Sequence, residues 1–141
     1  MRAHWMCLAL AAVATAFPST APAAPSKCSS ADAKRAEEQS SGIRDWNVLY
    51  RAYKRYAPCD DAGVSEGYSE AVSQLLSRKW PVVTRFGVLA REDPEFRGFV
   101  VRHIDDTVPA GTLASIRRNA TERCPTGLQS ICREIAAAAH P

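Results

Sequence analysis

The 141-residue sequence lacks the short motifs of common catalytic and nucleotide-binding sites. It contains no Gly-x-Ser-x-Gly nucleophile elbow, no Walker loop and no His-Glu-x-x-His zinc motif. Histidine is scarce: there are three in the chain, and two of them, His4 and His140, lie close to its ends. Because His103 alone cannot complete a metal site, we expect no metal and no cofactor.

The chain also has little excess of either charge. It carries 18 Lys and Arg against 15 Asp and Glu, for a formal net charge of +3. Proteins that bind nucleic acid or anionic membranes as their main partner usually show a stronger basic bias. We therefore expect no nucleic-acid partner.

The sequence has one long apolar run, from Trp5 to Phe17, behind a short basic start. The run is shorter than the roughly 20 residues that cross a bilayer. Small residues follow it, and Ala21-Pro22-Ala23 matches the cleavage pattern of a secretory signal peptide. We expect a signal peptide over residues 1–23 and a single mature domain over 24–141 without stable membrane insertion. The Ala-rich composition, with Arg in excess of Lys, suggests export to a bacterial periplasm or secretion.

Four cysteines lie beyond the predicted signal: Cys28, Cys59, Cys124 and Cys132. An even number of thiols in a short exported chain indicates a disulfide framework. Four cysteines allow three pairings, and we favour Cys28 with Cys59 and Cys124 with Cys132. The turn signal Pro125-Thr126-Gly127 supports the second pair, since it would bring a helix carrying Cys132 back toward Cys124. A four-cysteine zinc site is the alternative, but the chain has no C-x-x-C pair.

Helical signals recur along the mature chain, and no alternating strand pattern accompanies them. Cap residues, glycines and prolines divide the chain into seven short segments. The predicted helices run from Ser29 to about Gln39, from Asp45 to Tyr56, from Asp60 or Asp61 to Lys79, from Pro81 to Ala90, from Pro94 to Ile104, after Pro109 through Leu113 and Ile116, and from about Thr126 to Ala139. We expect an all-α fold, a compact bundle or orthogonal array of about six to seven short helices with two disulfides.

The predicted helix after Asp45 divides its side chains between two faces. One face should be core, and it carries Trp46, Leu49, Tyr50, Tyr53, Tyr56 and Ala57. Arg44, Arg51 and Arg55 fall on the opposite side, with Lys54 beside them. This basic stripe is the predicted contact surface for a partner that is acidic or rich in phosphate. An ordinary solvated helix face is the alternative.

A row of small residues, Gly63, Gly67 and Ala71, follows one side of the next predicted helix. Each glycine in a helix costs about 1 kcal/mol relative to alanine. We expect a neighbouring helix to pack closely against this row and offset that cost.

Glu66 and Glu70 are the best candidates for a catalytic carboxylate pair. Their spacing puts them on one helical face, and paired carboxylates divide the acid and base roles in glycoside hydrolysis. The same projection points them to solvent, where a carboxylate is a poor acid at neutral pH. His103, which is followed by Asp105 and Asp106, is the other candidate, but its apolar neighbours favour a hydrogen-bonded core residue.

These patterns favour an exported, non-enzymatic binding module that contacts another protein, such as an inhibitor, an immunity protein or an envelope adaptor. The alternative is a small secreted hydrolase that acts on cell-wall or polysaccharide substrates through a carboxylate pair. The layout of a signal followed by a small disulfide-stapled helical domain is similar to that of periplasmic immunity proteins, which protect bacteria from secreted wall-degrading toxins. This resemblance is one of architecture and assigns no residues.

Overall fold

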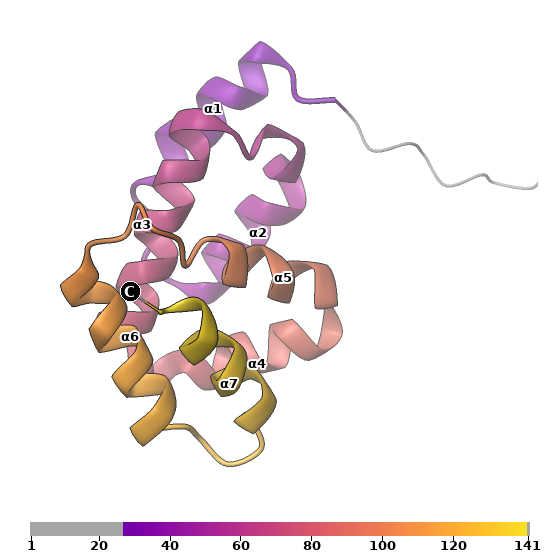
Figure 1. Ribbon diagram of the computed structural model, residues 1–141. Coiled ribbons are helices and arrows are strands. Elements are labelled where there is room, and N and C mark those ends of the chain that lie inside the picture. The colour runs from indigo at the N-terminus through magenta and orange to yellow at the C-terminus, as the bar shows by residue number, and fades with distance from the viewer. Residues whose placement is uncertain (1–26, 141) are drawn as a thin grey trace, which may run out of the picture.

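The computed structural model describes residues 27–140, and helices account for the secondary structure of this part of the chain (Figure 1). The elements in chain order are α1 (Ser30–Ser40), α2 (Trp46–Tyr56), the 3-10 turn η1 (Ala57–Cys59), α3 (Ala62–Arg78), the 3-10 turn η2 (Trp80–Val82), α4 (Val83–Glu92), α5 (Pro94–Arg102), α6 (Ala110–Glu122) and α7 (Gln129–Ala138). This confirms the predicted all-α fold. The predicted signal peptide, residues 1–23, lies outside the described residues.

Polar caps start the first helices where the sequence predicts. The Ser29 hydroxyl accepts a hydrogen bond from the amide of Asp32 at 3.1 Å, as in a capping box. The Asp45 carboxylate accepts from the amides of Asn47 at 2.8 Å and Val48 at 3.2 Å. These bonds satisfy amides that have no partner within their own helix, which is why both helices begin there.

Two predicted helix starts come too early. Pro81 lies inside η2, so α4 begins at Val83. The last helix begins at Gln129 because Gly127 adopts φ +83°, a left-handed conformation that a right-handed helix cannot include.

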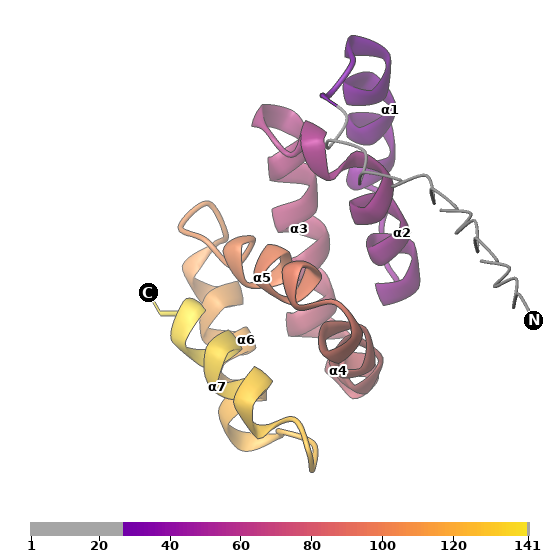
Figure 2. The same cartoon turned by 90° about the vertical axis from the view of Figure 1, so that its right-hand side faces the viewer.

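The long helix α3 connects the two ends of the molecule (Figures 1 and 2). Helices α1 and α2 form an antiparallel hairpin beside its first half, and α6 packs against it with α7 alongside. Helices α4 and α5 pack on each other between these two groups. The fold is therefore an irregular helical array around one central helix.

Aromatic rings fill the centre of the core. Trp46 of α2 stacks on Phe86 of α4 with ring centroids 4.8 Å apart. The ring centroid of Tyr53 lies 5.2 Å from that of Phe96 and 4.9 Å from that of Phe99, and both phenylalanines belong to α5. The predicted apolar face of α2 is thus largely confirmed as core, although two of its members, Tyr50 and Ala57, are only half-buried.

Both favoured disulfides are present. Cys28 and Cys59 link the start of α1 to the end of η1 across 31 residues, and their Cα atoms lie 4.9 Å apart. Cys124 and Cys132 link the α6–α7 turn to α7 across eight residues. On the loop-entropy model the first bond stabilises the fold by about 4 kcal/mol and the second by about 2 to 3 kcal/mol.

Helix α1 ends in close contact with α3 at Gly67. A Cβ atom on Gly67 would lie 2.0 Å from the Ser40 hydroxyl oxygen and 2.6 Å from the Ser40 Cβ. Ser40 is buried there, and its hydroxyl donates a hydrogen bond to the carbonyl of Glu37 at 3.1 Å. The prediction that the small-residue row admits a close neighbour is confirmed, and that neighbour is α1.

Replacing Gly67 with alanine should therefore destabilise the protein by about 1 to 3 kcal/mol, because the added methyl group overpacks this contact. Gly111 in α6 is the matched control, since a Cβ there meets nothing within 4 Å. Gly111→Ala should be neutral or stabilise by up to about 1 kcal/mol through helix propensity. Urea unfolding of both variants under oxidising conditions makes the comparison. A Gly67→Ala variant as stable as Gly111→Ala would show that the two helices do not meet this closely.

Candidate functional site

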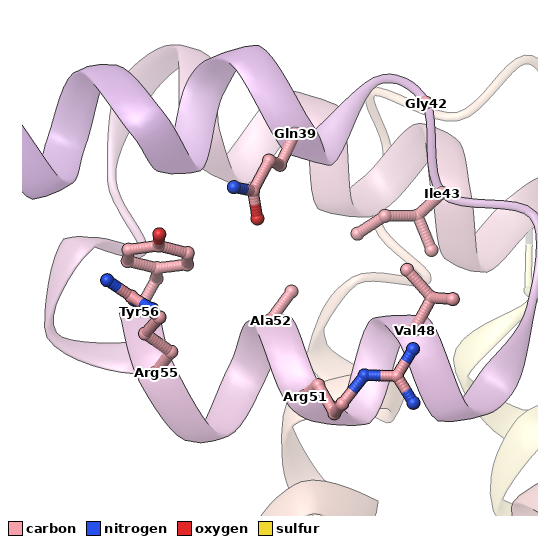
Figure 3. Close-up of a pocket in the computed structure, with 8 residues that line it drawn as sticks. All are labelled: Gln39, Gly42, Ile43, Val48, Arg51, Ala52, Arg55 and Tyr56. Atoms are coloured by element: carbon pink, nitrogen blue, oxygen red, sulfur yellow. The ribbon is translucent and has the colours of Figure 1, made fainter.

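A groove of about 430 Å³ runs between α1 and α2 (Figure 3). Its lining residues are Gln39, Gly42, Ile43, Val48, Arg51, Ala52, Arg55 and Tyr56. Gln39 reaches in from α1, Gly42 and Ile43 come from the connecting turn, and α2 supplies the rest. The volume lies within the range of roughly 300 to 1,000 Å³ that is typical of ligand pockets.

Both ends of the α1–α2 hairpin are fixed. At one end the Cys28–Cys59 disulfide joins the start of α1 to η1, directly after α2. At the other end Arg44 braces the connecting turn: its guanidinium donates hydrogen bonds to the carbonyls of Ser41 at 3.0 Å and Ile43 at 2.8 Å. The spacing between the groove walls is therefore set by covalent and hydrogen-bonded links.

Arg51 and Arg55 lie one helical turn apart on the exposed edge of the groove. Neither guanidinium forms a hydrogen bond or ion pair with any residue between 27 and 140. The Arg55 guanidinium lies 5.2 Å from the centroid of the Tyr56 ring, a cation–π distance. The pKa of Asp45 is lowered chiefly by the hydrogen bond from the Val48 amide, and the positive charge of Arg51 adds to this effect.

Lys54 belongs to a different face of α2. Its ammonium group lies 3.2 Å from Oδ2 of Asp93, and the Tyr50 hydroxyl donates to the same oxygen at 3.2 Å. Successive helical residues point about 100° apart, so Lys54 turns toward α5 while Arg55 faces the groove.

The four predicted basic residues are thus not one stripe. Arg44 precedes α2 and braces the turn, with its guanidinium 3.8 Å from a carboxylate oxygen of Glu70. Lys54 pairs with Asp93, and Arg51 and Arg55 remain at the groove.

Glu66 and Glu70 share an exposed face of α3, as their spacing predicts. They border a hollow of about 310 Å³ with Ser69, Ser73, Thr107, Val108 and Pro109. The Glu70 carboxylate accepts a hydrogen bond from the Gln74 amide group at 2.8 Å. Ser73 is buried one turn beyond Ser69 and donates to the Glu70 carbonyl at 3.0 Å.

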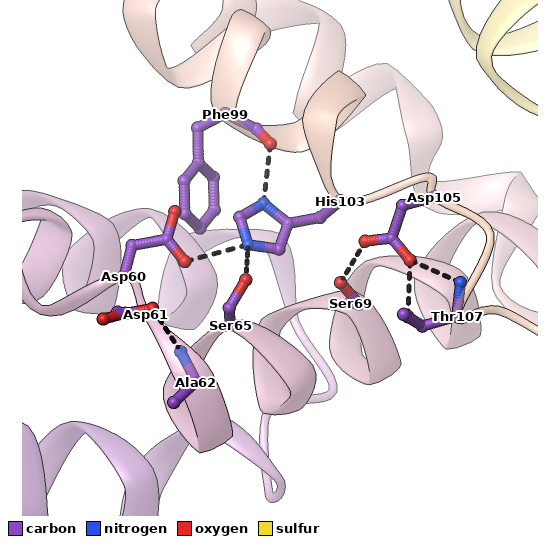
Figure 4. Close-up of polar contacts among 9 residues, drawn as sticks. All are labelled: Asp60, Asp61, Ala62, Ser65, Ser69, Phe99, His103, Asp105 and Thr107. Atoms are coloured by element: carbon purple, nitrogen blue, oxygen red, sulfur yellow. Dashed lines mark hydrogen bonds and ion pairs between the residues drawn. The ribbon is translucent and has the colours of Figure 1, made fainter.

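His103 is buried and makes three polar contacts (Figure 4). Its Nδ1 donates to the Phe99 carbonyl at 2.8 Å, since a carbonyl can only accept. Its Nε2 lies 3.1 Å from Asp60 Oδ1 and 3.4 Å from the Ser65 hydroxyl. A catalytic triad needs the acid on one ring nitrogen and the hydroxyl on the other. Here both contact Nε2, so these residues do not have the triad arrangement.

Asp105 does not join His103 in an acid–base pair. Its carboxylate accepts from the Ser69 hydroxyl at 2.8 Å and from the Thr107 amide at 2.9 Å, and it also contacts the Thr107 hydroxyl (Figure 4). Partial burial raises the pKa of Asp105, but the bonds from Thr107 and Ser69 outweigh burial and lower that pKa overall. Asp106 is exposed, so the predicted cluster of His103 with the two aspartates is not assembled.

Sequence reasoning missed the second wall of the groove, to which Gln39 and Ile43 belong. Apolar periodicity indicates which face of a helix is buried but not which neighbour covers it. Asp93 was recognisable as a helix cap before Pro94. Its contact with Lys54, 39 residues away, is not visible in the sequence.

Other classes of site find no support in the part of the chain that the structure describes. Between residues 27 and 140 no three His, Cys, Asp or Glu side chains are grouped so as to hold a metal ion. Within the same range no helix is both long and apolar enough to cross a membrane.

Comparison with protein-family models gives no match, and neither curated proteins nor solved structures provide a similar chain.

The Asp93 contact gives a test of how α2 is held against α5. Asp93 caps α5 by accepting from the Phe96 amide at 3.0 Å. Burial raises the pKa of Asp93, but the bonds from Phe96 and Lys54 outweigh burial and lower that pKa overall. The carboxylate therefore stabilises the fold above its ordinary pKa of 3.8, and this stabilisation is lost as the pH falls through the lowered value.

Asp93→Ala should cost about 1 to 2 kcal/mol at neutral pH, mostly through loss of the cap. Asp93→Asn should cost less than about 1 kcal/mol, because asparagine also caps helices and the ion pair with Lys54 is exposed. Urea unfolding at neutral pH and well below pH 3.8 should show the difference between wild type and Asp93→Ala shrinking in acid. A difference that does not change with pH would mean that the charge of Asp93 contributes nothing.

Proposed function

We propose that the chain is an exported, non-enzymatic binding module that acts by contact with another protein, as an inhibitor, an immunity protein or an envelope adaptor does. The observation that carries the proposal is the pair Arg51 and Arg55 beside the α1–α2 groove. These two cations have no ion-pair partner among residues 27–140, whereas the other basic groups of the predicted stripe are engaged in bonds within the fold.

The two disulfides support a location outside the cytosol. Two disulfides in a domain of this size are typical of proteins that fold in an oxidising space such as the periplasm or the extracellular medium. Together with the predicted signal over residues 1–23, they favour export. A partner would then be another envelope or secreted protein.

The contacts of Glu70 and His103 favour a binding function over a catalytic one. Glu70 is engaged with Gln74 and Arg44, and His103 is used to tie α5 to the start of α3. A catalytic centre needs a general acid or base poised beside a site for the reacting atom. The bonds of Glu70 and His103 are accounted for by the fold.

A small secreted hydrolase is the second candidate. It is favoured by the hollow of about 310 Å³ beside Glu66 and Glu70, since a pair of carboxylates flanks the bond that is cleaved in glycoside hydrolysis. The hollow and the α1–α2 groove share no lining residue, so substitutions can be directed at each of them, and Glu70 is the residue of the hollow that also contacts Arg44, at 3.8 Å.

The deciding experiment uses the double variant Glu66→Gln with Glu70→Gln. We expect it to remain folded and to capture the same partner as wild type from the exported fraction. Neither protein should hydrolyse peptidoglycan or polysaccharide, because these carboxylates face solvent and perform no chemistry. Glu122→Gln, an exposed carboxylate on α6, is the matched control. Hydrolysis by wild type and by the control that disappears in the double variant would establish the hydrolase instead.

A further inference from the structure

The α1–α2 groove combines an apolar floor with two unpaired cations on one edge. Ile43 and Tyr56 are almost fully buried at its ends, and Ala52 lies between them. Val48 is 40% exposed, one of three large apolar side chains between residues 27 and 140 with this degree of exposure. Of these four side chains Val48 keeps substantial exposed surface beside Arg51, and a docking partner would cover it.

The two arginines are spaced to meet two carboxylates. Residues four apart on a helix have Cβ atoms about 5 to 6 Å from each other. Two carboxylates of a partner can match this spacing in either conformation. Alternate side chains of an extended segment lie about 7 Å apart, and side chains one turn apart on a helix lie about 5 to 6 Å apart. Guanidinium groups bind carboxylates with two parallel hydrogen bonds, which favours this pairing over a single point charge.

We infer that the groove binds an acidic segment of a partner protein, with two carboxylates on Arg51 and Arg55 and an apolar side chain against Val48 and Ala52. This inference rests on the proposed function and names the surface and the chemistry of the partner. The groove is already formed between braced helices, so little conformational freedom is lost when the segment binds.

Phosphate-bearing partners fit the surface less well. Nucleic acids and anionic membranes gain affinity from many cations spread over a broad face. Arg51 and Arg55 are the charged residues of the groove lining, Lys54 is paired with Asp93, and the carboxylate of Asp45 lies close enough to Arg51 for their charges to interact. A narrow groove with two cations and an apolar floor suits a short acidic peptide segment.

The test measures binding of a fluorescein-labelled peptide of about ten residues that combines glutamate with leucine, enough to span the groove in an extended conformation. The disulfide-bonded protein is purified from the exported fraction. We expect saturable binding of this peptide, with amide NMR shifts at Val48, Arg51 and Arg55. The same peptide with glutamine in place of glutamate should bind at least about tenfold more weakly.

The variant Arg51→Glu with Arg55→Glu should weaken peptide binding by at least about tenfold, because repulsion replaces attraction. Arg117→Glu with Arg118→Glu is the matched control: these two exposed arginines of α6 give the same change in net charge away from the groove. The control should change affinity by less than about twofold at physiological salt, where distant charges are screened. Circular dichroism checks that both variants fold, and single Arg51→Gln and Arg55→Gln variants replace the double variant if it does not.

Three results would overturn the inference: equal loss of binding in the two double variants, no peptide binding at millimolar concentration, or tighter groove-dependent binding of heparin or phosphatidylglycerol vesicles than of the peptide. Its failure is separable from that of the proposed function. If wild type and the groove variant capture the same natural partner equally well, the groove assignment is wrong and the binding module stands. If hydrolysis depends on Glu66 and Glu70, the proposed function itself is wrong.

Discussion

The Cys28–Cys59 disulfide holds the two walls of the α1–α2 groove at a fixed separation. It joins the hairpin at its open end, where an uncrosslinked pair of short helices could splay, and Arg44 braces the closed end. The hairpin is in turn seated on α3, because Gly67 leaves room for Ser40 to approach the backbone of the central helix. Isolated helices of this length are marginal in water, so α1 and α2 depend on these contacts to keep their shape.

Charge pairing within the fold decides which cations remain for a partner. Asp93 is shared between the cap of α5 and the side chains of Lys54 and Tyr50, which fixes that flank of α2. Arg51 and Arg55 lie on another side of α2 and form no ion pair with a residue between 27 and 140, although the positive charge of Arg51 contributes to lowering the pKa of Asp45. An uncompensated pair of this kind adds little to stability, but it raises the association rate and the selectivity toward an acidic partner.

The local chemistry of the sequence predicted much of this fold. Asp45 and Asp93 act within a few residues, so the helix starts that they cap were visible in the sequence. The Cys124–Cys132 pairing followed from the turn signal Pro125-Thr126-Gly127, which lies between two cysteines only eight residues apart. Non-local contacts were not visible. The partnership of Lys54 with Asp93 and of His103 with Asp60 joins residues about 40 positions apart, and it follows from how α5 lies across α2 and α3. For the same reason the basic stripe was predicted with four members, whereas two of them face the groove.

The most direct test of the central claim, that the groove is where a partner sits, is site-specific photocrosslinking in cells that produce the 141-residue chain. A photoreactive amino acid replaces Val48 at the groove in one variant and Val82 of η2 in another, and both positions are exposed, at 40% and 49%. We expect a discrete crosslinked product from position 48 that is absent when Arg51→Glu and Arg55→Glu are added, and none from position 82. A product from position 82 with none from position 48 would contradict the account and move the interface to the α3–α4 side of the molecule.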